Sequence, residues 1–173
     1  MNQAEHCRLC NHQEVDLKTG TTCGLTNMKP DFDKSCPTID FSERLENKIT
    51  EVNSSYENIK RKSALTYIYS VLILSISLAV MIGGWYLGKY VYDAGAASSV
   101  PIIIIGVGFI LLPAAFGPLN FHRRDLKTAK KEKDKLDKIL SQYNINYSID
   151  IKFGKEIHGS QDVYTNLKFQ KIK

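Results

Sequence analysis

The chain has 173 residues, of which 24% are charged and 43% are hydrophobic, and its formal net charge is +5. The charges are unevenly distributed, because no Asp, Glu, Lys or Arg occurs in residues 63–88 or 94–121. Each of these stretches exceeds the roughly 20 apolar residues that cross a bilayer. The composition excludes one large soluble core, and it predicts a membrane α-helical hairpin with two transmembrane helices.

The first forty residues hold four cysteines at the spacing of metal ligands. Cys7 and Cys10 form a C-x-x-C pair, and Cys23 and Cys36 follow farther along the chain. Four thiolates of this kind suit a tetrahedral zinc ion, and so short a segment usually needs a metal, a disulfide or a partner to fold. We therefore expect residues 1–40 to be a four-cysteine zinc-binding module with structural zinc as its cofactor. A redox-active thiol pair and incidental free cysteines are the alternatives.

Four cysteines would fill a closed zinc site, so His6 and His12 are expected outside the ligand set, either close to the site or on the surface. A catalytic zinc keeps one position open, and this site does not. The chain also lacks a phosphate-binding loop and a nucleophile paired with a base. We expect no catalytic residue and no enzymatic activity.

The cysteines belong to a longer motif, which also includes Asp16, GxxCGLT at 20–26, KPDF at 29–32 and CP at 36–37. This motif resembles a cysteine-rich leader found on small uncharacterised membrane proteins of Bacteroidota. The resemblance is limited to about residues 7–37. It implies a bacterial inner-membrane protein, and it implies no activity.

Residues 41–62 predict a cytosolic amphipathic helix that begins near Ser42 and Glu43. Its apolar residues recur at alternating steps of four and three, as in a coiled-coil seam. These residues are Leu45, Ile49, Val52, Tyr56 and Ile59. The same face continues into the next segment as Ser63, Thr66, Ser70, Ile73, Ser77, Val80 and Gly84. Small side chains let transmembrane helices approach closely, so we expect this face to pack throughout, unless the small residues are simply tolerated in a span.

The charge-free stretches predict transmembrane helix 1 at 63–88 and transmembrane helix 2 at 100–121, joined by an extracytoplasmic loop at 89–99. Pro101 suits the first turn of the second span, whereas Pro113 is expected to kink it. Two buried helices in a soluble core are the alternative, but the second span lacks the polar stripe of a soluble helix. The spans are therefore expected to face lipid.

Residues 122–143 predict a cytosolic basic amphipathic helix whose apolar seam is interrupted by Lys133. The seam residues are Leu126, Ala129, Leu136, Leu140 and Tyr143. This helix is rich in lysine, whereas residues 41–59 have a net charge of −2, so the two are expected to pair as an antiparallel stalk. Acidic residues interleave with the lysines and stacking aromatics are missing, so no nucleic-acid partner is expected.

Residues 144–173 predict a cytosolic β-hairpin, because apolar and polar residues alternate in two runs. The apolar residues are Ile145, Tyr147, Ile149, Ile151 and Phe153 in the first run and Val163, Thr165, Leu167 and Phe169 in the second. The turn is expected within residues 154–162, where His158 and Asp162 are ordinary polar loop residues. An isolated hairpin is marginally stable, so its apolar face is expected to dock on the zinc module, a second copy or another protein.

Basic residues flank the two spans at 60–62 and from 123 onward, whereas the loop between the spans holds one Lys and one Asp. By the positive-inside rule both termini are cytoplasmic, in a multi-pass protein of the bacterial inner (plasma) membrane. The reducing cytosol disfavours disulfides and favours the zinc interpretation. Arg123, Arg124 and Lys127 are expected to contact anionic lipid headgroups.

Taken with the absence of a catalytic constellation, these features favour a non-enzymatic scaffold, assembly factor or interaction platform. The alternative is an oligomeric membrane effector or sensor that changes membrane permeability on a cytosolic signal. Partners would be a further copy of the chain or another membrane protein. Two sets of small residues in the first span suit a homo-oligomer. They are the face Ser75, Ala79 and Gly83, and the motif Gly84-x-x-x-Gly88.

The orientation can be tested by cysteine labelling in a variant without the four native cysteines. A cysteine at Ser99 should react with a membrane-impermeant maleimide added to intact spheroplasts, and one at Ser141 should react only after permeabilisation, because the basic flanks hold both termini inside. Labelling of Ser141→Cys from outside, with Ser99→Cys protected, would show that the chain has the opposite orientation.

Overall fold

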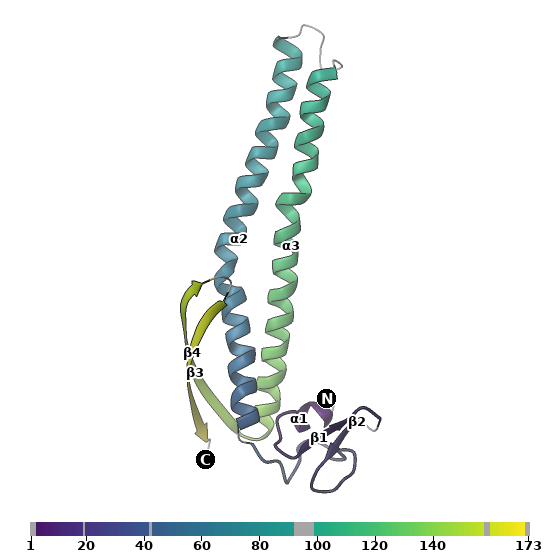
Figure 1. The fold of residues 1–173 in the computed structure, drawn as a ribbon, viewed down its shortest axis with the longest axis vertical. Helices are drawn as coiled ribbons and strands as arrows, with labels where there is room; N and C mark the ends of the chain where they lie inside the picture. Colours follow the sequence, from purple (N-terminus) through teal and green to yellow (C-terminus); the bar gives the residue numbers. More distant parts are fainter. Residues whose placement is uncertain (1–2, 19, 42, 92–98, 158–159, 172–173) are drawn as a thin grey trace. The chain divides into compact units, whose positions relative to one another are not determined.

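A computed structural model of the chain describes residues 3–18, 20–41, 43–91, 99–157 and 160–171 (Figure 1). The elements are, in order, α1 (Gln3–Cys7), β1 (Gln13–Asp16), β2 (Gly20–Cys23), α2 (Glu43–Tyr90), α3 (Ser99–Gln142), β3 (Ile145–Ile157) and β4 (Ser160–Lys171). The chain divides into two compact units. Unit 1 comprises Met1–Glu57 and Ala129–Lys173, and unit 2 comprises Asn58–Thr128.

Each predicted span forms one continuous helix with its neighbouring amphipathic segment. α2 covers most of 41–62 and all of 63–88, and α3 covers 100–121 and nearly all of 122–143. Ser42, most of the expected loop at 89–99 and the turn residue His158 lie outside the described residues. α2 begins with Glu43 and Glu46, whose negative charges favour a helix N-terminus.

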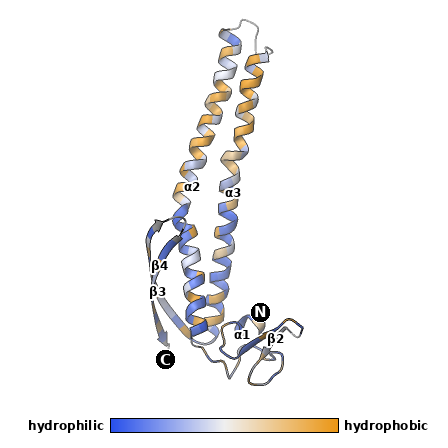
Figure 2. Ribbon diagram, in the orientation of Figure 1, coloured by the Kyte–Doolittle hydropathy of each residue, from blue (hydrophilic) through white to orange (hydrophobic). Residues whose placement is uncertain are grey.

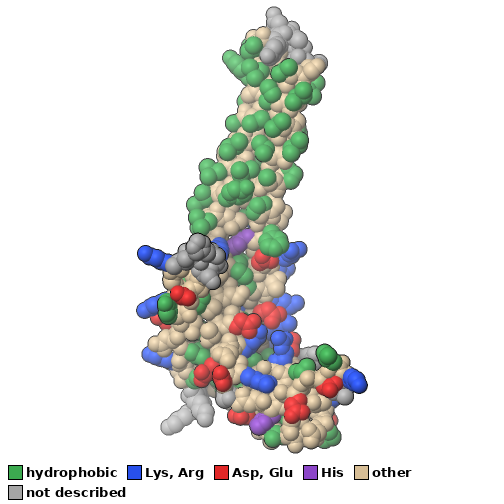
Figure 3. Space-filling model, viewed as in Figure 1, with side chains coloured by type: hydrophobic (Ala, Val, Ile, Leu, Met, Phe, Trp, Pro, Cys, Tyr) green, Lys and Arg blue, Asp and Glu red, His purple; other side chains and the backbone are tan. Residues whose placement is uncertain are grey.

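Both long helices contain a stretch that is long and apolar enough to cross a membrane. Only 11% of this stretch is buried in α2 and 17% in α3. The core helices of a soluble protein would be mostly buried, so the alternative of a soluble helix pair is disfavoured. Figure 2 shows the apolar part of each helix, and Figure 3 shows hydrophobic side chains over the surface of unit 2. These features are consistent with a membrane protein.

Within unit 2, the face of α2 that carries small residues packs against α3, as the sequence predicts. All of its residues from Ser63 to Gly84 are buried or half-buried. The Ser77 hydroxyl is fully buried and donates a hydrogen bond to the carbonyl of Gly108 at 2.7 Å. A Cβ atom on Gly84 would lie only 3.0 Å from the side chains of Ile104 and Ile105. The helices can approach this closely because both contribute small residues.

This packing changes the interpretation of the motif Gly84-x-x-x-Gly88. Both glycines are buried within the chain, so the motif serves the contact between α2 and α3 and not a homo-oligomer. Ser75 and Ala79 are exposed, and a Cβ atom on Gly83 would meet no atom within 4 Å. The face formed by Ser75, Ala79 and Gly83 is therefore the set of small residues that does not pack against α3.

The prolines of α3 behave differently from one another. Pro101 lies in the first turn, as expected, where a missing N–H costs no helical hydrogen bond. Pro113 and Pro118 lie inside the helix, and α3 continues through both as a single helix. Membrane helices tolerate such prolines because neighbouring groups satisfy the freed carbonyls.

Aromatic and basic side chains meet at both ends of unit 2. The Arg123 guanidinium lies 6.0 Å from the ring centroid of Tyr67, and the Ser63 hydroxyl lies 2.8 Å from His122 Nε2. At the other end, Lys89 lies 5.1 Å from the centroid of Trp85. This pattern matches the preference of aromatic rings and snorkelling cations for membrane interfaces.

The core of unit 1 joins the N-terminal segment, both helices and the hairpin. Its buried residues are Leu9, Leu45, Ile49, Val52, Leu136, Ile139 and Leu140. The residues packed against them are Phe41, Tyr143, Ile145, Tyr147, Ile149 and Leu167. The core thus contains Leu45, Ile49 and Val52 of the first predicted seam and Leu136 and Leu140 of the second, with Ile139 as an addition. The other predicted seam residues Tyr56, Ile59, Leu126 and Ala129 are half-buried. The hairpin packs on this cluster of its own chain, which includes Leu9 of the N-terminal segment as well as residues of both helices. Docking of the hairpin on a second copy or on another protein stays a prediction.

β3 and β4 pair antiparallel, with Tyr147 opposite Phe169 and Ile149 opposite Leu167. The strands reach Ile157 and Ser160, so the predicted turn at 154–162 was too wide. A shift of register between Phe153 and Glu156 places an irregularity at Gly154, where a Cβ atom would lie 3.3 Å from Asp162 Cβ. The glycine thus marks a bulge inside the ribbon and not its turn.

The close approach of the helices can be tested with two glycines of α3. Gly108→Leu should destabilise unit 2 by about 1 to 3 kcal/mol, because its added side chain would overlap Met81 and the backbone of Ser77. Gly106→Leu is the matched control, since a Cβ atom there meets nothing within 4 Å. Calorimetric melting of the protein in detergent should show a lower Tm for the first variant only. Equal melting temperatures would contradict this packing.

Candidate metal site

Two short turns place the cysteines of the N-terminal segment. Cys7 ends α1, and the N–H of Cys10 donates to the carbonyl of Cys7 at 3.0 Å, which closes the C-x-x-C turn. Cys23 ends β2 and lies opposite Gln13 of β1. Cys36 lies in the loop that leads to α2.

Two glycines allow the chain to turn beside Cys23. Gly20 has a φ of +82°, a left-handed conformation that side chains rarely adopt. The N–H of Gly24 donates to the carbonyl of His12 at 2.7 Å. A Cβ atom on Gly24 would lie 2.9 Å from the Glu14 carboxylate and 3.3 Å from that carbonyl. A larger residue at this position would have to displace the Glu14 side chain and would crowd the His12 carbonyl.

The four cysteines predicted as ligands converge on one small cavity. Cys7, Cys10, Cys23 and Cys36 all line it, together with His12, and its volume is about 20 Å³. This volume suits one water molecule or ion. Cys7 and Cys10 are buried, the other two are half-buried, and all four are free thiols. His12, which the sequence placed outside the ligand set, thus borders the same space.

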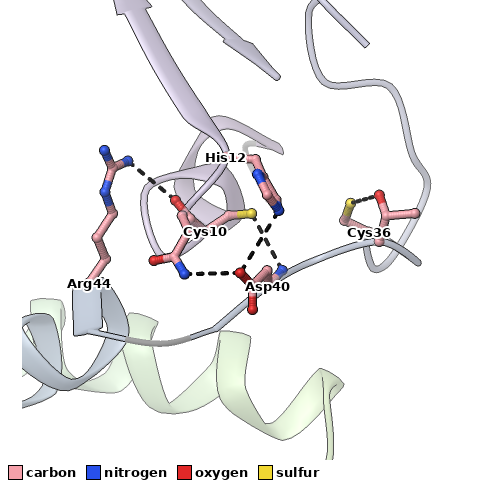
Figure 4. Close-up of polar contacts among 7 residues, drawn as sticks. Cys10, His12, Cys36, Asp40 and Arg44 are labelled. Atoms are coloured by element: carbon pink, nitrogen blue, oxygen red, sulfur yellow. Dashed lines mark hydrogen bonds and ion pairs between the residues drawn. The ribbon is translucent and has the colours of Figure 1, made fainter. Parts of the chain in front are cut away.

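The four cysteines line one cavity, but their side chains are not arranged as metal ligands. Among the described residues, no group of three or more His, Cys, Asp or Glu side chains is placed to hold a metal ion. The sulfur atoms instead contact protein groups (Figure 4). Cys10 Sγ accepts the N–H of Asp40 at 3.5 Å, and Cys36 Sγ lies 3.6 Å from the Thr38 hydroxyl. The four-cysteine zinc module predicted from the sequence is therefore not shown, although its residues are brought together.

The thiols experience different electrostatic surroundings. Burial raises the pKa of the Cys7 thiol, and the negative charges of the other three cysteines raise it further. Hydrogen bonds from the N–H of Leu25 and from the N–H and hydroxyl of Thr26 lower the pKa of the Cys23 thiol. Deprotonation is therefore easier at Cys23 than at Cys7, where a second thiolate would be repelled unless a cation is present.

Tyr143, at the end of α3, anchors the segment from a distance in sequence. Its hydroxyl accepts the N–H of Cys36 at 2.9 Å and lies 2.9 Å from His6 Nδ1. Burial lowers the pKa of His6, so its ring is neutral near pH 7 and can accept the hydroxyl proton. The Tyr143 ring also packs against Phe41 and His6. His6 therefore supports the cysteine cavity from outside, as expected.

The start of α2 holds the C-x-x-C turn from the other side. Arg44 donates to the carbonyls of Cys10 and Gln13 at 3.3 and 3.2 Å. Asp40 accepts a hydrogen bond from Asn11 Nδ2 at 3.0 Å and lies 3.8 Å from His12 Nε2 (Figure 4). No pattern in the sequence indicated that Asp40, Arg44 or Tyr143 belongs to this site. Their roles depend on contacts between residues that are far apart in the sequence.

Comparisons of the chain with protein-family models, with curated proteins and with solved structures gave no match. The resemblance of the cysteine motif to leaders of Bacteroidota membrane proteins is therefore neither supported nor contradicted.

Proposed function

We propose that this chain is a two-span protein of the bacterial inner membrane whose cytosolic unit 1 is a non-enzymatic interaction platform. The observation that carries the proposal is the apolar surface of the N-terminal segment. Leu17 and Met28 are 105% and 65% exposed, and Val15 and Leu25 are also exposed. Isolated exposed apolar residues are common, but four within one small segment indicate a surface that a partner covers.

The basic flanks support the proposed orientation. Arg123, Arg124 and Lys127 are exposed on one end of unit 2, where they would contact anionic headgroups of the cytoplasmic leaflet. Both termini belong to unit 1. With the spans inserted as the positive-inside rule requires, unit 1 lies in the cytosol.

We further propose that structural zinc stabilises this platform, with Cys7, Cys10, Cys23 and Cys36 as its ligands. The chemistry of the donors supports this, because four free thiols border one cavity that suits a single ion. A bound dication would turn the repulsion among the thiolates into attraction and so supply folding energy. The N–H groups directed at Cys23 and the N–H of Asp40 directed at Cys10 would stabilise the thiolates.

The second candidate function is an oligomeric effector or sensor that alters membrane permeability. One observation favours it: Ser75 and Ala79 are exposed on α2, and Gly83 has open space beside it. A face of small residues lets another transmembrane helix approach closely. Conductance of the purified protein in liposomes distinguishes this function from a platform, which would conduct no ions.

Zinc binding can be measured directly. Protein purified without chelators should contain about one zinc per chain by elemental analysis, and Cys23→Ser should lose most of it. His12→Ala is the matched control, because His12 borders the cavity but is outside the proposed ligand set. Wild-type protein without zinc and with four freely titrating thiols would rule the metal out. If His12→Ala loses its zinc and Cys23→Ser keeps it, His12 would be a ligand in place of one cysteine.

The platform can be tested by site-specific photo-crosslinking in native membranes. A photoreactive phenylalanine analogue at Leu17 should give discrete adducts, because this exposed side chain belongs to the proposed contact surface. The same analogue at Asn166, which is exposed on β4 in the same unit, is the control. Equal adduct patterns at the two positions, or none at Leu17, would contradict a partner at the N-terminal segment.

A further inference from the structure

The main chain of two proposed zinc ligands is bonded to the two long helices, one ligand to each. At the end of α3, the Tyr143 hydroxyl accepts the N–H of Cys36 at 2.9 Å. At the start of α2, Arg44 Nη1 donates to the carbonyl of Cys10 at 3.3 Å (Figure 4). Both bonds are made to backbone groups and not to the sulfur atoms. The positions of these two ligands and of the helix ends therefore depend on each other.

Tyr143 has two separable roles in unit 1. Its ring packs against the core and meets the ring of Phe41 edge to face, at a centroid distance of 5.0 Å. Its hydroxyl bonds to Cys36 and also lies 2.9 Å from Nδ1 of His6, which is buried and precedes Cys7 in the chain. The hydroxyl thus joins the segments that carry two of the four cysteines. Replacing tyrosine by phenylalanine would remove this link and keep the ring.

The sulfur atoms must rearrange before they can hold an ion, but only locally. All four cysteines already line one cavity of about 20 Å³. Cys10 Sγ accepts the N–H of Asp40 at 3.5 Å, and Cys36 Sγ lies 3.6 Å from the Thr38 hydroxyl. Metal ligands are ordered by the ion that they hold, and binding energy becomes folding energy. Ordered ligands would therefore make the bonds of Tyr143 and Arg44 more persistent.

We propose that the Tyr143 hydroxyl and Arg44 are positioning residues that couple metal binding at the cysteines to the order of the helix ends in unit 1. The inference rests on the proposed zinc site and goes beyond it, because it makes unit 1 a metal-responsive module. A ligand that prefers the ordered state shifts the equilibrium toward that state. By linkage, ordered helix ends raise the affinity for the ligand by the same factor.

The first test measures hydrogen exchange of the full-length protein in detergent micelles, with and without zinc, by mass spectrometry. In wild-type protein, saturating zinc should slow exchange in the last turns of α3, residues 136–142, by about fivefold or more. In Tyr143→Phe, saturating zinc should slow it by no more than about twofold, because the link to Cys36 is gone.

The wild-type result separates this inference from the zinc site itself. Wild-type protein that binds zinc without slower exchange in residues 136–142 would overturn the coupling and leave the zinc site intact. Wild-type protein that binds no zinc would overturn both.

The second test measures zinc affinity by competition with a chromophoric chelator. Tyr143→Phe and Arg44→Gln should each weaken zinc binding by about tenfold, which is the usual effect of losing a group that orients a metal ligand. Lys48→Gln is the control for Arg44→Gln, because Lys48 lies one turn later on α2 and its ion pair is with Glu51. The control should bind zinc as tightly as the wild type.

Tyr147→Phe is the matched control for Tyr143→Phe. It removes a tyrosine hydroxyl from the same core, where the hydroxyl bonds to Asp137 and the buried Asn53 and not to the cysteine segment. Zinc affinity should be unchanged in this variant. Equal loss of affinity in both tyrosine variants would indicate general destabilisation and overturn the proposal, as would wild-type affinity in both Tyr143→Phe and Arg44→Gln. If a variant unfolds, hydrogen exchange of the wild-type protein decides the proposal.

Discussion

The structure depends on one face of α2, which carries the packing residues of both units. In unit 1 this face presents Leu45, Ile49 and Val52, and in unit 2 it presents Ser70, Ser77 and Gly84. The change from large to small residues fits the proposal that unit 1 lies in water and unit 2 in a bilayer. In water, burial of large aliphatic side chains drives association. In lipid that driving force is absent, and helices gain most from close backbone approach and interhelical hydrogen bonds such as Ser77 to Gly108.

The sequence predicted best the features that show as a regular spacing of apolar residues or as the length of a charge-free stretch. The step of three and four residues identified Ile49 and Leu140 as core positions, and both are almost fully buried. Alternation identified the face of β3 that carries Tyr147 and Ile149. Charge-free length identified the two helices that can cross a membrane. Each signal follows directly from backbone geometry, so no knowledge of distant contacts was needed.

What the sequence could not predict are single contacts between distant residues. Tyr143 was predicted as a seam residue, but its hydroxyl also holds Cys36, 107 positions away. Asn53 follows the seam residue Val52 and carried no signal of burial. Gly154 carried a turn signal, yet it lies in a bulge. In each case the role of the residue depends on which distant part of the folded chain lies next to it. The local sequence around one residue does not contain that information.

The division of unit 1 between the two ends of the chain has a consequence for its synthesis. Its N-terminal part ends at Glu57, and its C-terminal part begins at Ala129. Tyr143, which anchors Cys36, is made roughly 4 to 17 s after Glu57 if translation proceeds at about 5 to 20 residues per second. During that interval both spans must leave the ribosome while the cysteine segment lacks its anchor. The N-terminal segment is therefore most vulnerable to premature association while the chain is being made.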